Sequence, residues 1–181
     1  GYPVIDLEAI AQHRGSVFGR VGIRKSVSQK MFDALLYEEL RRINSDILIA
    51  EDESRVIGNI HIPESLWQKK EQGIFIEIEA DLETRLKNII EEYTAFEGWQ
   101  EEIQRAINKI RKYLGEEKYK TAIGMLKNGQ IEDLALFLMR EYYDKIYKLN
   151  KRIHIRLHCS NEEECLMRVK EIYSNLLKEG V

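Results

Sequence analysis

The sequence predicts an α/β fold in which a parallel sheet is flanked by helices and interrupted by a helical insert. Short β-like runs alternate with helical segments over most of the chain, which is typical of a parallel sheet with helical crossovers. One run, at residues 47–50, is fully apolar, as expected of a strand covered on both faces. Only two prolines occur among the 181 residues, and no flexible linker is evident. We therefore expect a single domain over residues 1–181, with the helical insert at about 99–150.

Four strands are predicted from apolar or alternating runs, at residues 3–7, 47–50, 74–78 and 153–157. Helix starts are marked by residues that favour the first positions of a helix, namely Ser28, Pro63, Asp81 and either Ser160 or Asn161. The helix after Ser28 should run to about Ile43. Its expected buried face carries Met31, Leu35, Leu36 and Leu40. From Trp99 to about Asn150 the periodicity is helical throughout, which defines the insert.

Composition excludes several classes of protein. Lys and Arg number 28 against 31 Asp and Glu, so the net charge of −3 creates no general attraction to nucleic acid, and any such contact must come from a local basic patch. Cys159 and Cys165 are too few for a disulfide framework and lack zinc-site spacing, so we expect them to pack as small apolar residues in a reducing cytoplasm. The longest apolar run, at residues 134–139, is far too short to cross a membrane.

The segment at residues 13–19, His-Arg-Gly-Ser-Val-Phe-Gly, is the most distinctive motif. Arg14 can bind a phosphate through two hydrogen bonds, Gly15 and Gly19 allow close approach of a ligand, and backbone amides together with Ser16 can donate to an anion. These properties predict a phosphate site. His13 is a candidate acid or base near neutral pH, although it could equally tie the loop to the backbone.

The residues after this motif, Arg20, Arg24 and Lys25, could extend the site toward a nucleic-acid backbone. The alternative is an ordinary solvated face.

A second candidate site follows the apolar run at residues 47–50. Glu51 and Asp52 end this run in the manner of a Walker B element, in which an acid positions Mg²⁺ beside a phosphate. Asp52 is the candidate ligand for Mg²⁺, and Glu51 and Asp52 are candidate catalytic residues. Glu53, Ser54 and Arg55 continue the segment as candidate ligand-binding groups. The alternative role for the acids is to cap the strand end or the element that follows.

The order and spacing of these segments closely resemble the carboxy-terminal domain of the tRNA 2-selenouridine synthase family. The resemblance is carried by residues 3–8, 11–19, 51–58 and 62–67, and more loosely by Arg85, Glu92, Tyr93 and Tyr142 to Asp144. It implies a P-loop NTPase-like fold and a cytoplasmic enzyme. In this family a rhodanese-like domain with a reactive cysteine precedes a P-loop domain. The family replaces the sulfur of wobble 2-thiouridine in tRNA by selenium from selenophosphate, by way of an intermediate made with geranyl diphosphate.

Two features of the family pattern lie outside this sequence, which has neither a rhodanese cysteine loop nor a G-x-x-x-x-G-K-[ST] motif. The family's P-loop lies shortly before the segment at residues 3–8, and the first residue is Gly rather than Met, so we expect the chain to begin just after that motif. The central strand of the sheet, between the runs at 47–50 and 74–78, should then be missing. Alone, these residues should bind diphosphate or tRNA weakly and be inactive without a rhodanese-like domain in the same or a partner chain.

Two other functions fit the residues. A small-molecule kinase would turn over nucleoside triphosphate without tRNA. A non-catalytic tRNA-binding module would hold tRNA through the helical insert, and its salt-dependent binding would survive loss of Arg14 or Asp52.

Overall fold

A computed structural model describes residues 2–146, 153–159 and 161–179. Its first half contains, in chain order, β1 (Val4–Ile5), α1 (Leu7–Ala11), α2 (Gln29–Arg42), β2 (Ile49–Ala50), β3 (Val56–Ile57), β4 (Ile60–His61), α3 (Glu64–Glu71), β5 (Phe75–Glu79) and α4 (Leu82–Thr94). Its second half contains α5 (Trp99–Lys109), α6 (Arg111–Leu114), α7 (Glu116–Lys127), α8 (Ile131–Leu138), the π-helical turn η1 (Met139–Tyr143), α9 (Asp144–Ile146), β6 (Ile153–His158) and α10 (Glu162–Glu179).

The strands form three separate two-stranded sheets rather than the one parallel sheet that the sequence predicted. β1 pairs with β2, and β5 pairs with β6, both in parallel. β3 and β4 form an antiparallel hairpin that the sequence analysis missed. Its turn begins at Gly58, whose φ of 60° suits a tight hairpin turn. The mixed α/β class is confirmed, and the two parallel pairs are not joined to each other among the described residues.

The predicted caps are confirmed where they can be seen. Backbone amides donate to the side chains of Ser28 and Asp81 at the starts of α2 and α4, and to Asn161 before α10. Ser160, the alternative cap, lies outside the described residues. Pro63 precedes α3 as its N-cap rather than occupying its first turn. The first predicted strand was too long, because Asp6 caps α1 and Leu7 already belongs to that helix.

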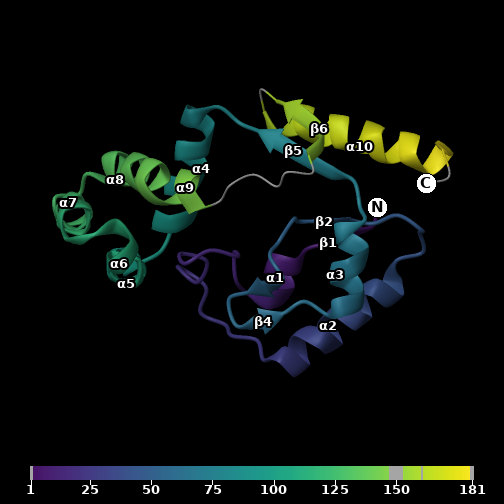
Figure 1. Cartoon of the computed structure of the whole chain (residues 1–181), viewed down its shortest axis with the longest axis horizontal. Helices are drawn as coiled ribbons and strands as arrows, with labels where there is room; N and C mark the ends of the chain where they lie inside the picture. Colours follow the sequence, from purple (N-terminus) through teal and green to yellow (C-terminus); the bar gives the residue numbers. More distant parts are fainter. Residues whose placement is uncertain (1, 147–152, 160, 180–181) are drawn as a thin grey trace.

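The helical insert is present from Trp99 to Ile146, and the last four residues predicted for it, 147–150, lie outside the described residues. Figure 1 shows α5 to α8 gathered at one end of the molecule, away from α1, α2 and α3. Among the described residues no helix is long and apolar enough to cross a membrane.

Two hydrophobic cores hold the chain together. One joins α1, α2 and the β3–β4 hairpin, with Phe32 and Ile57 fully buried. The other joins α5 to η1, with Ile107 fully buried. In α2 the inward residues are Phe32 and Leu36, so the predicted buried face is corrected, since Met31 and Leu35 are exposed.

Candidate functional site

The segment at residues 13–19 connects the two cores. Ala11, just before it, is buried with α1 and α2. Phe18 is buried instead in the helical core, where it packs against Tyr93 and Tyr143. The polar residues between Ala11 and Phe18 are therefore held where the α/β part meets the helical insert.

The backbone of this segment does not form the open ring of donors that the sequence predicted. The amide of Arg14 donates to the Gly19 carbonyl, the amide of Ser16 to the Arg14 carbonyl, and the amide of Gly19 to the Ser16 carbonyl. The amide of Phe18 donates to the Ser16 hydroxyl. Because these four amides are engaged within the loop, they are not available to an anionic ligand.

Arg14 is held in place by three neighbours. Its Nε lies 2.5 Å from a carboxylate oxygen of Glu92, and one terminal nitrogen donates to the Val21 carbonyl at 2.8 Å. Its guanidinium also lies 5.2 Å from the centre of the Tyr93 ring. Arg14 is thus oriented toward α4. To bind a phosphate there, its guanidinium would have to contact both the phosphate and Glu92, or give up Glu92 for the phosphate.

Ser16 lies at the centre of a small group of hydroxyls. Tyr143 of η1 donates to the Ser16 hydroxyl at 3.1 Å. Burial raises the pKa of Tyr93 of α4, and the nearby Ser16 hydroxyl acts in the opposite direction. Neither tyrosine was among the candidate site residues, although both lie in segments that carry the looser part of the resemblance. Tyr142 and Tyr143 were expected to serve helix packing, and Tyr142 does pack against Tyr113.

His13 is wedged between two glycines. Ideal Cβ atoms built on Gly19 and Gly58 would lie 2.8 Å and 2.6 Å from atoms of its ring, so both positions leave room only for hydrogen. Its Nδ1 is buried and has no hydrogen-bond partner among the described residues. Burial lowers the pKa of His13, and the positive charges of Arg20 and Lys109 add to this effect. These contacts favour the role of joining the loop to the β3–β4 hairpin.

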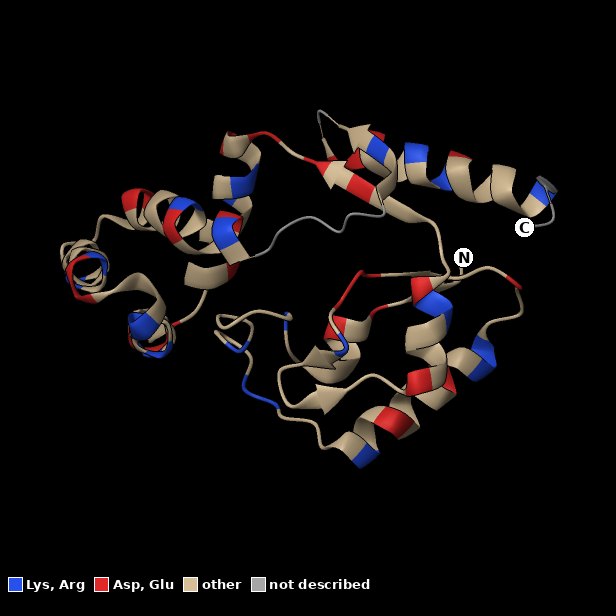
Figure 2. Cartoon of the chain, viewed as in Figure 1, with Lys and Arg blue, Asp and Glu red and all other residues tan. Residues whose placement is uncertain are grey.

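Acidic side chains gather on the other side of the loop. Glu51 accepts a hydrogen bond from the Leu7 amide at 2.9 Å, and burial is the main cause that raises its pKa. Burial also raises the pKa of Glu8 to about 8, helped by a hydrogen bond and the negative charge of Glu53. Figure 2 shows the acidic stretch after β2 beside the start of α1. At neutral pH, Glu8 is therefore largely protonated.

Asp52 pairs with a lysine that the sequence analysis did not select. Lys70 of α3 lies 2.5 Å from the Asp52 carboxylate and donates to the Glu53 carbonyl, and its side chain is only 13% exposed. The Lys70 ammonium also lies 4.4 Å from the centre of the Trp67 ring. Among the described residues no group of three metal-binding side chains could hold a metal ion. The Asp52 carboxylate, paired with the Lys70 ammonium, therefore does not fit Mg²⁺.

Ser54 and Arg55 are turned to local partners. The Ser54 hydroxyl donates to the Val56 carbonyl, and Arg55 pairs with Glu64 at the start of α3. Ser54 and Arg55 thus make these contacts with residues other than Arg14 and Ser16. The carboxylate of Glu53, in contrast, packs against Gly15.

A cavity of about 350 Å³ opens between α4, α8 and the loop. Its polar lining residues are Glu8, Arg14, Ser16, Arg85, Glu92, Tyr93, Thr94 and Tyr143, and the part around Arg14 and Ser16 is its polar end. The rest of its lining is mostly apolar and includes Ile89, Ile90, Trp99, Ile103, Leu134, Ala135, Leu138 and Met139. This volume is within the usual range for small-molecule sites, about 300–1,000 Å³. The arrangement suits a ligand with an apolar chain and an anionic group at one end.

The predicted basic residues Arg20, Arg24 and Lys25 are exposed. Their loop is fastened to α5, because the Gly22 amide donates to Glu102 at 2.8 Å. Lys109, at the end of α5, is close enough to act electrostatically on His13 together with Arg20. The structure thus adds one lysine to the basic group expected from the sequence.

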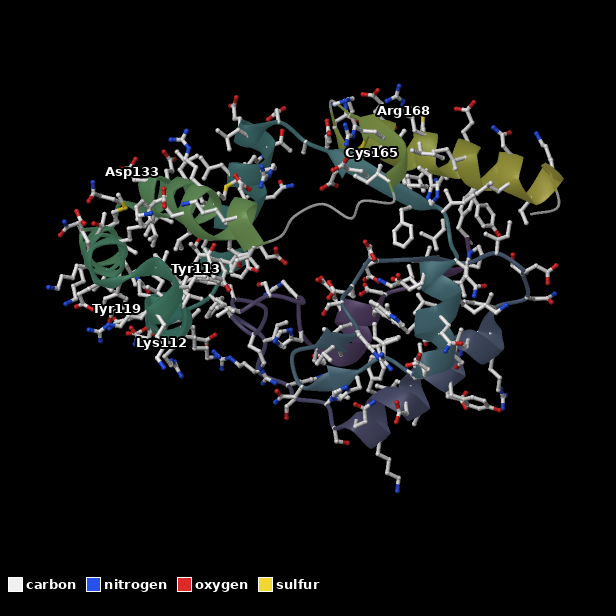
Figure 3. All side chains as sticks on the ribbon, in the orientation of Figure 1. Lys112, Tyr113, Tyr119, Asp133, Cys165 and Arg168 are labelled. Carbon is white, nitrogen blue, oxygen red and sulfur yellow. A yellow bond between two sulfur atoms is a disulfide. The ribbon has the colours of Figure 1, made fainter. Side chains whose placement is uncertain are left out.

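Cys159 and Cys165 form a disulfide, which corrects the expectation that they pack as unpaired apolar residues. The bond joins the end of β6 to the first turn of α10. Arg168, one turn further along α10, donates to the His158 carbonyl, and Figure 3 shows Cys165 and Arg168 at the start of this helix.

Residues 2–173 match the family model described as the tRNA 2-selenouridine synthase AAA domain. The match includes every candidate residue described above. No solved structure shows significant similarity to the chain.

Proposed function

The chain belongs to the tRNA 2-selenouridine synthase family, as its AAA domain, and from this premise we propose that it binds geranyl diphosphate. The observation that carries the proposal is the cavity beside Ser16, whose lining is mostly apolar. Its charged residues are Arg14, Arg85, Glu8 and Glu92, and Glu8 is largely protonated at neutral pH because burial raises its pKa to about 8. An isoprenoid diphosphate has the same division, with a hydrocarbon chain and an anionic head.

The geranyl chain would lie between α4 and α8. Leu138 and Met139 are buried and line this part of the cavity. Burial of an apolar chain there would contribute a favourable free energy of about 25 cal/mol per Å² of apolar surface removed from water. The diphosphate would lie at the polar end, near Arg14 and Arg85. Both arginines have carboxylate partners, Glu92 and Asp144, which the ligand would have to share or displace. Selenophosphate, the other phosphate-bearing substrate, would use the polar end alone.

The tRNA that carries 2-thiouridine at its wobble position would approach over the basic residues at the edge of the site. Arg20, Arg24, Lys25 and Lys109 are exposed, and the positive charges of Arg20 and Lys109 add to burial in lowering the pKa of His13. Phosphate contacts of this kind weaken as salt increases. Selenium transfer itself would need the rhodanese-like domain, in the same or a partner chain.

The separate parallel pairs, β1–β2 and β5–β6, agree with a P-loop NTPase-like sheet whose central strand would lie between β2 and β5. We include this arrangement in the proposal. The proposed function is tested by ratios of affinities, which do not depend on this arrangement.

The test is a titration of the protein with geranyl diphosphate and with inorganic diphosphate, followed by calorimetry or NMR. We expect Ala135→Leu, which fills the cavity, to weaken geranyl diphosphate about tenfold and to leave inorganic diphosphate within about twofold, as loss of one buried group of this size suggests. Arg14→Gln should weaken both. Thr121→Leu on α7, outside the cavity lining, is the control. A protein that binds both ligands equally would disprove an apolar subsite.

A further inference from the structure

Tyr113 of α6 exposes an aromatic ring on the helical insert. The residue is 47% exposed, although its ring packs edge-on against Tyr142, with 5.2 Å between the ring centres and 90° between the ring planes. Tyr142 is itself only 5% exposed. Because a buried ring holds the exposed one in place, a flat ligand that stacks on Tyr113 would cost little side-chain entropy.

A row of rings leads from Tyr113 to the cavity. Tyr142 packs edge-on against Tyr143, with 5.3 Å between the ring centres. Tyr143 in turn lies 5.9 Å from Phe18 and donates to the Ser16 hydroxyl. Tyr143 and Ser16 both line the cavity. The exposed ring of Tyr113 is therefore separated from the polar end of the cavity by only two ring-to-ring contacts.

Two exposed lysines flank Tyr113. Lys109 is the last residue of α5, and Lys112 belongs to α6. The Tyr113 amide donates to the carbonyl of Ile110, which joins the two helices, so helical spacing continues across the junction. Lys109 then lies about one turn before Lys112 and Tyr113, on the same side of the chain. Neither lysine forms an ion pair with another residue that the structure describes.

The other tyrosine nearby, Tyr119 of α7, is engaged within the insert. The guanidinium of Arg111 lies 4.6 Å from the centre of its ring, and its hydroxyl donates to Asn108. Tyr113 has no hydrogen bond from its side chain and no cation over its ring among the described residues. Figure 3 shows Tyr113, Lys112 and Tyr119 on the insert. Tyr113 and the two lysines thus differ from their neighbours in having no such internal partners.

We propose that Tyr113 stacks against a base of tRNA next to the wobble 2-thiouridine, and that Lys109 and Lys112 contact the adjoining phosphates. The inference rests on the proposed function, which places the reaction of the wobble base at the polar end of the cavity. Enzymes that modify a base separate it from its neighbours, and the unstacked bases of RNA loops stack on aromatic side chains. The basic loop at residues 20–25 is fastened to the same helix, α5, through Gly22, so the positive surface continues toward it.

The first test measures, by fluorescence anisotropy, the affinity of the 181-residue chain for a synthetic RNA hairpin that carries the wobble 2-thiouridine. Tyr113→Leu keeps an apolar side chain against Tyr142 and removes the stacking ring, so it should weaken binding about tenfold, within the range for one stacked base. Tyr113→Phe should bind as the wild type. Tyr37→Leu on α2, where the tyrosine is 61% exposed, is the control and should also bind as the wild type.

The second test changes the RNA. Two further hairpins each lack the base on one side of the wobble position. Wild-type protein should bind one of them about tenfold more weakly, and Tyr113→Leu should lose nothing more on that hairpin, because the stacked base is already absent. Lys109→Ala and Lys112→Ala should each reduce the slope of log affinity against log salt by about one, whereas Lys127→Ala, at the end of α7, should not.

The outcomes separate this inference from the proposed function. Unchanged affinity in Tyr113→Leu, or losses that add when this variant meets the shortened hairpin, would overturn the stacking. Unchanged salt slopes would overturn the phosphate contacts, and wild-type protein that binds no RNA would overturn both. The RNA titrations contain no geranyl diphosphate, so a failure to bind that ligand would disprove the proposed function without altering these results.

Discussion

The carboxylate of Glu53 occupies the space that a side chain at position 15 would fill. A Cβ atom on Gly15 would lie 2.4 Å from one of its oxygens, and the φ of Gly15 is +63°. Gly15 is thus required both for its left-handed backbone and for the approach of the acidic segment after β2.

Gly15→Ala should therefore destabilise the protein by at least about 1 kcal/mol, from backbone strain alone, with more from displacement of Glu53. The measurement is chemical denaturation. Adding Glu53→Ala should recover the part due to the clash and leave the strain. Gly124→Ala, in α7 with no atom within 4 Å of the new Cβ, should instead stabilise by about 0.5–1 kcal/mol. Equal stability of Gly15→Ala and wild type would show that Glu53 does not pack there.

His13 should titrate below its ordinary pKa. Burial, Arg20 and Lys109 all favour the neutral ring. Since the folded pKa is lowered, the stability from this group is complete above about pH 6.5 and is lost as pH falls through the folded value. NMR of the ring protons, assigned with His13→Asn, measures this directly. A pKa above 6.5 would contradict the burial of the His13 ring between Gly19 and Gly58. It would restore His13 as a candidate for acid–base chemistry at neutral pH.

Glu8 should make the protein less stable as pH rises. Its pKa is raised to about 8 in the folded state, mainly by burial. The favourable contribution is therefore complete below about pH 4.5 and is lost progressively as pH rises to about 8. The Tm of Glu8→Gln minus the Tm of wild type should therefore increase as pH rises through this interval and stay constant above it. The exposed Glu38→Gln on α2 is the control. A difference between Glu8→Gln and wild type that does not change with pH would exclude a protonated Glu8.

Lys70 and Asp52 should be coupled in a double-mutant cycle. We expect Lys70→Met and Asp52→Asn to show an interaction energy of about 1 kcal/mol, partly retained in high salt because the lysine is only 13% exposed.

The same pair bears on metal binding. With Lys70 on the Asp52 carboxylate, addition of MgCl₂ should leave the Tm of the wild type unchanged. A rise in Tm with MgCl₂ that disappears in Asp52→Asn would reinstate Asp52 as a magnesium ligand.

Local features of the fold were accessible from the sequence. Ser28, Asp81 and Asn161 cap the helices predicted to follow them, because capping depends on a side chain and an amide only a few residues apart. The helical insert was also found, since its periodicity runs over many turns. On the predicted face of α2, Leu36 is buried and Leu40 packs against the core, whereas Met31 and Leu35 are exposed. Phe32 is buried in place of Met31, because both are apolar and only tertiary packing decides between them.

Features that depend on distant partners were not accessible. The pairing of β1 with β2 joins residues 45 positions apart, and nothing local shows that the pairs remain separate sheets. The hairpin did have a local signal, the Gly58-Asn59 pair between the apolar residues Val56-Ile57 and Ile60. In the candidate site, the sequence singled out the motif containing Arg14 and Ser16, but the residues that contact this motif, Glu92, Tyr93 and Tyr143, lie on other elements. Their roles follow from contacts that no spacing along the chain reveals.

The π-helical turn of η1 also constrains the length of the chain. A π turn holds about one residue more than an α turn between hydrogen-bonded groups. Deleting one residue between Met139 and Tyr142 would remove this extra residue and let the segment continue as a regular α-helix, with the residues that follow close to their present orientation. A deletion inside the regular helix α8 would instead rotate everything after it by about 100°, one residue's share of a 3.6-residue turn. The tyrosine that contacts Ser16 would then face elsewhere even though no side chain had changed, so this helix should tolerate substitutions more readily than insertions or deletions.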